Sequence, residues 1–184
     1  MPRSVLVVHA SRYGQTQKIA SRIADVAEQE GAEVRVYDVG EVPPRIDLSA
    51  FDVVVLAGGI AWGKHPRSLR RFIVRTVAGR SLTHSILVSV SGAAESDATR
   101  ELAESYVHRL YRETGWCADS FVLFGGGVTF TRYGPFTRWM IRRMQLKNGR
   151  PADVTRDYDY TDWEAVDRFA RSLAVNPDAV GGVA

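Results

Sequence analysis

Short apolar runs alternate along the chain with longer segments that have helical spacing, and this alternation limits the fold more than any other feature. The expected strands are residues 4–9, 33–38, 53–58, 85–90 and 120–124. The expected helices are residues 16–29, 68–77, 98–114 and 162–173, the last with a capping box made by Thr161 and Glu164. This alternation is typical of a parallel sheet covered by helices on both faces. The sequence therefore predicts an α/β, open, doubly wound sheet, whose ligands bind in loops at the carboxyl ends of the strands.

The length and the cysteine content fit one domain in a reducing compartment. With 184 residues, of which 45% are hydrophobic, the chain can bury one core. Cys117 is the single cysteine, and no Cys/His cluster has the spacing of metal ligands. No signal peptide is visible, and no apolar run approaches the roughly 20 residues of a membrane span. We expect a cytoplasmic protein without a metal site.

The turn after the first expected strand carries an unusual density of hydrogen-bond donors. Residues 11–16 are Ser11, Arg12, Tyr13, Gly14, Gln15 and Thr16. Hydroxyl groups, the amide of Gln15 and the free backbone N–H groups of a helix start can converge there on one anion. The turn lacks the Gly pattern of dinucleotide-binding turns and the Lys-Ser/Thr ending of triphosphate loops. It therefore favours a phosphate monoester; the alternative is an ordinary capped turn.

Two further loops are suited to a flat ligand. The third strand leads into residues 58–65, which resemble a triphosphate loop, except that His65 stands where a magnesium-binding hydroxyl is required. We expect the backbone of this loop to contact the edge of a ring system that Trp62 flanks; the alternative is that Trp62 is buried in the core. The small residues after the fourth strand allow a similarly close approach. The cofactor-binding residues expected from these two loops are Gly59, Ile60, Ala61, Trp62, Gly63, Ser91, Gly92 and Ala93.

The positive charge of the chain is localised in one aromatic segment. The formal net charge is +3, yet residues 120–152 contain no Asp or Glu. The same segment contains Phe136, Trp139 and Met140, and Pro135 is well placed to begin a helix. Its basic residues are Arg132, Arg138, Arg142, Arg143, Lys147 and Arg150. Such a helix can lie on an anionic membrane surface, or it can simply cover the protein's own sheet.

These features together resemble a known family. The turn at residues 11–16, the Gly-rich third loop and the five strands resemble flavodoxin, the FMN-binding fold, over nearly the whole chain. More specifically, the turn, the segment from Arg132-Tyr133 through Met140-Ile141, and the ending Tyr160-Thr161-Asp162-Trp163-Glu164 with Phe169-Ala170-Arg171 resemble the flavodoxin-like, quinone-dependent protoporphyrinogen oxidases of bacterial haem synthesis. The third loop departs from that family's pattern, because Ala61 stands where an arginine precedes the aromatic residue.

The resemblance implies both a fold and an activity. It implies strand order 2-1-3-4-5 and a long insert, which the basic segment at about 128–150 would form. The single domain expected from the chain length covers residues 1–175, and the residues at 176–184 are expected to form a flexible tail. It implies an enzyme that uses FMN to oxidise protoporphyrinogen IX, with menaquinone or ubiquinone as acceptor. Arginines of the insert would hold the propionates, and its aromatic residues would hold the macrocycle or a membrane surface. The insert residues expected in these roles are Arg132, Phe136, Arg138, Trp139 and Arg142.

Other functions are weighed against this one. Electron-carrying flavodoxins are typically acidic, and this chain has the opposite charge, which favours the enzyme. An electron carrier and an NAD(P)H:quinone reductase nevertheless stay open as alternatives. The chain lacks the acidic residues that a phosphoacceptor signalling module needs after its first and third strands. No nucleic-acid-binding module surrounds the basic segment, so we expect no nucleic-acid partner.

Overall fold

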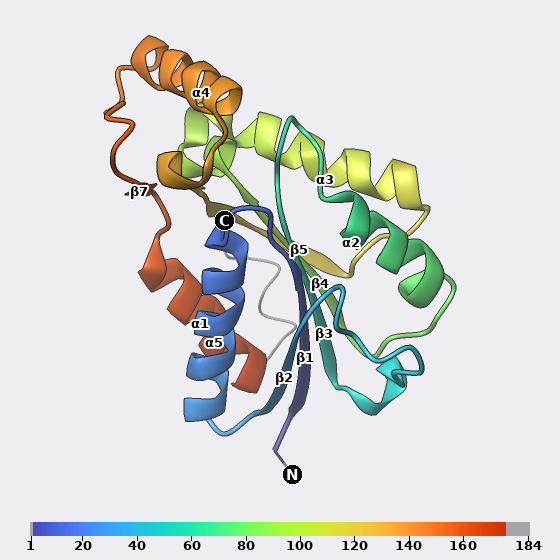
Figure 1. Ribbon diagram of the computed structural model, residues 1–184. Helices are drawn as coiled ribbons and strands as arrows, with labels where there is room; N and C mark the ends of the chain where they lie inside the picture. The colour runs from blue at the N-terminus through green and yellow to red at the C-terminus, as the bar shows by residue number, and fades with distance from the viewer. Residues whose placement is uncertain (1, 176–184) are drawn as a thin grey trace.

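Five parallel strands form the centre of the molecule (Figure 1). The structure is a computed structural model, and it describes residues 2–175. The strand order β2-β1-β3-β4-β5 confirms the predicted order. The predicted tail at 176–184 lies outside the described residues. The strands are β1 (Ser4–Ala10), β2 (Glu33–Asp38), β3 (Val53–Gly59), β4 (Ser85–Ser91) and β5 (Ser120–Gly125).

Helices cover both faces of the sheet, as predicted. Figure 1 shows α1 (Gln15–Gln29) and α5 (Trp163–Val175) on one side of the strands, with α2 (Arg67–Phe72) and α3 (Arg100–Thr114) on the other. A π-helical turn, Ile73–Val77, continues α2. The helices leave the carboxyl ends of the strands uncovered. This uncovered end of the sheet is called here the open edge.

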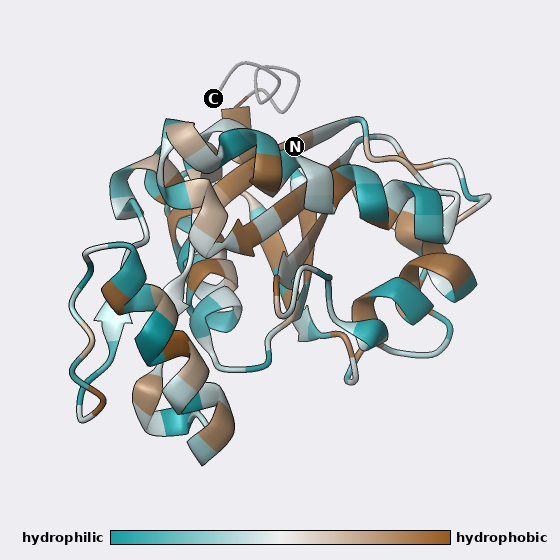
Figure 2. Ribbon diagram, turned by 90° about the horizontal axis from the view of Figure 1, so that it is seen from above, coloured by the Kyte–Doolittle hydropathy of each residue, from teal (hydrophilic) through white to brown (hydrophobic). Residues whose placement is uncertain are grey.

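The alternation of side chains along the strands divides the core into two layers. In β1, Val5 and Val7 pack towards α1 and α5, whereas Leu6 and Val8 pack towards α2. All four are fully buried, because each strand of a doubly wound sheet faces helices on both sides. Figure 2 shows the hydrophobic strands enclosed between helices with mixed surfaces.

Four strands extend one residue beyond their predicted ends. The extra residues are Ala10, Gly59, Ser91 and Gly125, all small residues of a kind that also occurs in turns. The ladder nevertheless continues through them, because backbone pairing such as Ser91 with Gly125 needs no particular side chain. The carboxyl edge of the sheet is therefore lined by small residues.

The start of α5 differs from the predicted capping box. The Asp162 carboxylate, rather than the Thr161 hydroxyl, accepts a hydrogen bond from the backbone N–H of Ala165 at 2.9 Å. Thr161 instead donates to the carbonyl oxygen of Gly125 at 2.9 Å. Asp is as good a cap as Thr, so the helix gains its cap while Thr161 is free to join the segment before α5 to the sheet.

Between β5 and α5 the chain forms an insert, defined here as residues 127–159. Strands β6 (Gly127–Val128) and β7 (Tyr158–Asp159) pair antiparallel at its base, so the insert extends past the predicted limit near residue 150. Between them, α4 (Pro135–Lys147) begins at the predicted proline. Figure 1 places α4 beyond the carboxyl ends of the strands. No helix among the described residues is long and apolar enough to cross a bilayer.

Candidate functional site

A hydrogen bond within the β1–α1 turn and a left-handed glycine define its shape. The hydroxyl oxygen of Ser11 accepts from the backbone N–H of Gly14 at 3.0 Å. Gly14 has a φ of 97°, a left-handed conformation that glycine adopts without a steric penalty. A Cβ at this position would also collide with the guanidinium group of Arg132. The turn therefore requires glycine and directs the first backbone N–H groups of α1 towards the open edge of the sheet.

Gln15 has a different role from the one predicted. Its side-chain nitrogen donates to Asp159 Oδ1 at 2.8 Å and to Thr161 Oγ1 at 2.7 Å. These two bonds use both donors of the amide, so they are not available to an anion. Gln15 thus joins the turn to the segment that leads into α5, and Ser11 and Thr16 stay as the hydroxyl groups suited to an anion.

The loop after β3 is a tight hairpin that presents Trp62. Ala61 and Lys64 exchange backbone hydrogen bonds of 3.0 and 3.2 Å. The two residues between them have positive φ values, 57° for Trp62 and 71° for Gly63, as in a type I′ turn. This conformation costs a bulky residue about 1–3 kcal/mol. Trp62 is also 56% exposed, so the alternative that it is a core residue is wrong.

The third loop approaches the first one closely at Gly59. A Cβ there would lie 2.6 Å from the hydroxyl oxygen of Thr16, so a larger residue would push the two loops apart. In the fourth loop, Ser91 Oγ accepts from the N–H of Ala94 at 3.2 Å. The carbonyl oxygen of Ala93 accepts from the Thr99 hydroxyl at 2.6 Å. These contacts fix the conformation of the β4 loop.

The three loops and α4 enclose a cavity of about 300 Å³, a size at the lower end of small-molecule sites. All of the predicted cofactor-binding residues except Gly14 and Ala93 line this cavity. They are Ser11, Arg12, Tyr13, Gln15, Thr16, Gly59, Ile60, Ala61, Trp62, Gly63, Ser91 and Gly92. Asp, Glu, His and Cys are absent from the described residues that line this cavity. The lining thus offers hydrogen bonds and apolar contacts rather than a general acid or base.

The insert contributes a largely apolar stripe, which the sequence predicted only in part, through Met140 and Met144. Tyr133, Thr137, Met140, Ile141 and Met144 line the cavity from the side opposite the sheet. Their spacing of three and four residues is the signal that could have identified this face of the helix. Of the aromatic residues predicted to act here, Phe136 is 71% exposed and Trp139 is 56% exposed, and neither lines the cavity.

The predicted arginines of the insert separate into different environments. Arg132 Nη1 donates to the carbonyl oxygen of Tyr13 at 3.0 Å, which ties the insert to the β1–α1 turn. Arg138 donates to the carbonyl oxygens of Phe130 and Tyr133 at 3.0 and 3.1 Å. Arg142 is exposed on α4. Two of the three therefore stabilise the insert itself.

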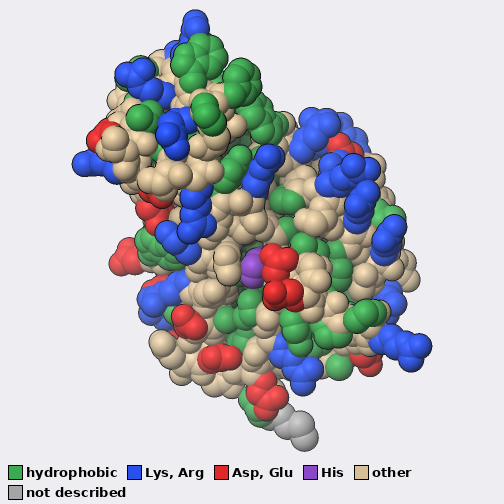
Figure 3. All heavy atoms as spheres, viewed as in Figure 1, with side chains coloured by type: hydrophobic (Ala, Val, Ile, Leu, Met, Phe, Trp, Pro, Cys, Tyr) green, Lys and Arg blue, Asp and Glu red, His purple; other side chains and the backbone are tan. Residues whose placement is uncertain are grey.

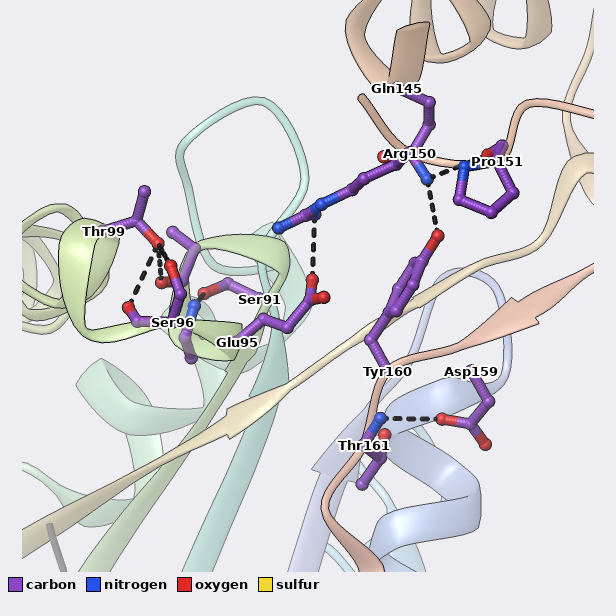
Figure 4. A network of polar contacts seen from close by, with 12 residues as sticks. Ser91, Glu95, Ser96, Thr99, Gln145, Arg150, Pro151, Asp159, Tyr160 and Thr161 are labelled. Carbon is purple, nitrogen blue, oxygen red and sulfur yellow. Dashed lines mark hydrogen bonds and ion pairs between the residues drawn. The ribbon is translucent and has the colours of Figure 1, made fainter. Parts of the chain in front are cut away.

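Polar contacts hold the far end of α4 to the body of the protein (Figure 4). Gln145, which is fully buried, donates to the hydroxyl oxygen of Tyr160 at 2.8 Å. Arg150 forms an ion pair of 2.8 Å with Glu95, and its guanidinium lies 5.4 Å from the centre of the Tyr160 ring. Because Glu95 follows β4, these contacts link the insert to the fourth loop of the cavity.

Two buried histidines lie near the open edge but do not line this cavity. Burial lowers the pKa of His9, and the carboxylates of Asp38 and Glu41 oppose that shift. Burial also lowers the pKa of His65 to about 4, with a contribution from the positive charge of Arg70. Both imidazoles are therefore neutral at neutral pH, and the positive charge of this region comes from arginine and lysine.

The residues fit a flat ligand with an anionic end. Ser11, Thr16 and the helix start offer donors to the anion. Glycines of the loops after β3 and β4 let the backbone approach a ring, and the stripe on α4 offers it an apolar face. This fit rests on the cavity and its lining.

Comparisons with known proteins agree with this fit. Protoporphyrinogen IX dehydrogenase [quinone] of Escherichia coli (strain K12) is 26% identical over 170 residues, which cover 92% of this chain and 93% of the relative. A protein of the same name from Leishmania major is 25% identical over 177 residues, covering 95% of this chain and 76% of the relative. The family resemblance predicted from the sequence is confirmed.

Solved structures show the same fold. Oxidised flavodoxin 1 from Bacillus cereus superposes with a TM-score of 0.55 at 16% identity, covering 94% of this chain and 98% of that one. A flavodoxin from the domain Archaea gives a TM-score of 0.53 at 16% identity, covering 95% and 99%. The family model described as a flavodoxin domain matches residues 6–155, which include the three loops and α4. The chain therefore belongs to the flavodoxin domain family.

Proposed function

We propose that this protein is an FMN-dependent enzyme that oxidises protoporphyrinogen IX to protoporphyrin IX and reduces a quinone, either menaquinone or ubiquinone. The observation that carries the proposal is one cavity lined on one side by the hydroxyl residues Ser11 and Thr16 of the β1–α1 turn and on the other by a largely apolar helical stripe. Membership of the flavodoxin family implies a flavin in that cavity. The names of the full-length relatives supply the substrate and the acceptor.

The phosphate is the part of FMN that the β1–α1 turn would hold. Ser11 and Thr16 would donate their hydroxyl groups to it, and the N–H groups at the start of α1 would complete the site. The hairpin after β3 would place Trp62 beside the ring system. When bound, the flavin supplies the redox chemistry, and the protein supplies position and electrostatics.

The chain's own residues would position the substrate and exclude water. The stripe of Tyr133, Met140, Ile141 and Met144 would cover an apolar macrocycle on the side away from the sheet. Oxidation to the porphyrin removes six electrons and six protons, which three quinones take up as three quinols. One hydrogen of each pair would leave with the electrons as hydride; the described lining of the cavity has no Asp, Glu or His to accept the other, which would leave as a proton to water.

The exposed face of α4 supports a peripheral position on the membrane that contains the quinone. Phe136, Trp139 and Leu146 are each more than half exposed, and basic side chains alternate with them. An amphipathic, basic helix of this kind binds anionic bilayers. We propose that the enzyme is cytoplasmic and rests on the inner face of the cell membrane through α4.

The test is an anaerobic assay of FMN-loaded protein with protoporphyrinogen IX, followed by porphyrin fluorescence. We expect formation of porphyrin to require a quinone and to exceed the spontaneous rate. Trp62→Asn is a useful variant, because Asn accepts the left-handed conformation but cannot flank a ring. Rapid reduction of quinone by NAD(P)H, or reduction only by a partner reductase, without porphyrin formation, would instead identify a quinone reductase or an electron carrier.

A further inference from the structure

A second cavity lies next to the first and has no role in the function proposed so far. It has a volume of about 580 Å³ and lies at the carboxyl ends of β1 and β2, beside the loop that follows β3. Ser11, Arg12, Ala61 and Trp62 line both cavities. The two are therefore neighbours, and a ligand in the first cavity can extend past Trp62 into the second.

The second cavity, called here the basic cavity, is lined by more positive than negative side chains. Arg70 is already paired with Glu113 at 2.7 Å, and Asp38 accepts from the N–H of Gly40 at 2.9 Å. The other charged residues of its lining are Arg12, Lys64 and Arg67, all exposed. None of these three forms an ion pair within the described part of the chain. Figure 3 shows Lys and Arg side chains gathered over the α2 and α3 side of the molecule.

His65 lies in the wall of the basic cavity but adds no charge. It is 3% exposed, and neither ring nitrogen has a hydrogen-bond partner within residues 2–175. Because the imidazole is neutral at neutral pH, the charge offered to a ligand comes from the arginine and lysine side chains. Arginine and lysine are the residues that bind carboxylates, arginine through a planar fork.

The arginines first expected to bind carboxylates line neither cavity. Arg132 and Arg138 donate to backbone carbonyl oxygens of the protein itself. Arg142 is exposed, and it is absent from the lining of both cavities. Among the described residues, the cations that line one or both cavities without an ion pair are Arg12, Lys64 and Arg67.

We propose that the basic cavity anchors the carboxylates of the reducing substrate, with Lys64 and Arg67 as their ligands and Arg12 at the passage between the cavities. The apolar body of the substrate lies against the stripe on α4, and its two carboxylates pass Trp62 into the basic cavity. This inference rests on the proposed function, because it takes the substrate to be a dicarboxylic tetrapyrrole.

The test compares the binding of protoporphyrin IX with that of its uncharged dimethyl ester to FMN-loaded protein, by fluorescence titration. We expect the dicarboxylate to bind at least about tenfold more tightly than the ester, since charge-assisted hydrogen bonds distinguish them. The double variant Lys64→Ala/Arg67→Ala should lose this preference. Arg75→Ala is the matched control, because Arg75 is exposed on the same helical segment but does not line the basic cavity, and it should keep the preference.

Each outcome bears on a different claim. If the double variant keeps the preference for the dicarboxylate, the anchor lies elsewhere and the inference is wrong, while the proposed function stands. If neither porphyrin binds, the proposed substrate is wrong and the inference fails with it. If NADPH binds instead and depends on Lys64 and Arg67, the basic cavity recognises phosphates and the inference is overturned. The variants are compared with the unmodified protein only if their FMN affinity and melting temperature are unchanged. If the alanine pair alters either quantity, the double variant Lys64→Gln/Arg67→Gln is used in its place.

Discussion

The helices α4 and α5 have the same length, 13 residues, and opposite relations to the core. The buried residues of α5 are apolar: Val166, Phe169, Ala170 and Leu173. The single buried residue of α4 is polar, Gln145. The large apolar residues that α4 exposes are Phe136, Trp139, Met144 and Leu146.

The difference separates what builds the fold from what is available to ligands. The apolar face of α5 packs against α1 and the sheet, as in most surface helices. α4 is instead held by polar contacts, such as Gln145 to Tyr160 and Arg150 to Glu95. Its apolar side chains are therefore divided between the cavity and the outer surface, where they can contact a substrate or a membrane.

The largest expected effect is on stability. Phe169→Ala removes a fully buried ring that contacts Phe124, with ring centres 5.8 Å apart, and should lower the free energy of unfolding by about 3–5 kcal/mol. Trp139→Ala, on the exposed face of α4, should change it by less than about 0.5 kcal/mol. Denaturant unfolding of both variants measures this contrast. Comparable losses would show that α4 is as much a part of the core as α5.

Acid should destabilise the body of the protein through His65. Burial lowers its pKa from 6.5 to about 4, so between these pH values the unfolded chain binds a proton that the folded chain does not. The free energy of unfolding is therefore not reduced by His65 above about pH 6.5, and it falls by up to about 3 kcal/mol as the pH approaches 4. His65→Gln should flatten this dependence in unfolding measurements at pH 7.5 and pH 5. An equally steep loss in the variant would assign the effect to other groups.

The polar attachment of α4 should be weaker than the core. Tyr160→Phe leaves the buried Gln145 without its bond to the hydroxyl, at a cost of about 1–2 kcal/mol. Trypsin should then cleave after Lys147 more rapidly, while the core stays protected. Unchanged cleavage with an unchanged stability would mean that this hydrogen bond does not hold the insert.

Membrane binding should depend on small contributions from individual charges. The protein should sediment with vesicles containing anionic lipid and be released by salt, because salt screens the attraction. Arg142→Ala and Lys147→Ala should each weaken binding by about fivefold, and Glu164→Ala, on α5, should leave it unchanged. A folded protein that stays out of the vesicle pellet at low salt would favour a helix that only covers the cavity.

The fold could be predicted because its signals are local and repeated. The continuous apolar run of β1, from Val5 to Val8, and the spacing of apolar residues in α1 are readable from a single sequence. The two-residue strands β6 and β7 were missed, since so short a pairing has no periodicity of its own. The ends of the strands were predicted one residue short where Gly, Ala or Ser continues the ladder.

The candidate site was predicted as a set of loops but not as a network. The sequence indicates that Gln15 is polar and near a helix start, but its partners Asp159 and Thr161 are more than 140 residues away. Likewise, the charge of Arg132 and Arg138 is evident from the sequence, whereas their bonds to backbone carbonyl oxygens depend on how the insert folds. Long-range partners of this kind require the tertiary structure.

The central claim is that the cavity between the sheet and α4 holds FMN with its phosphate in the β1–α1 turn. The most direct measurement is the melting temperature of the protein with FMN and with riboflavin, which lacks the phosphate. FMN at about 100 times its dissociation constant should add about 2.7 kcal/mol of stability, a rise of roughly 5–10 °C. Riboflavin at the same concentration should give a much smaller rise. Equal shifts with both ligands would contradict the phosphate site, and no shift with either would contradict the flavin itself.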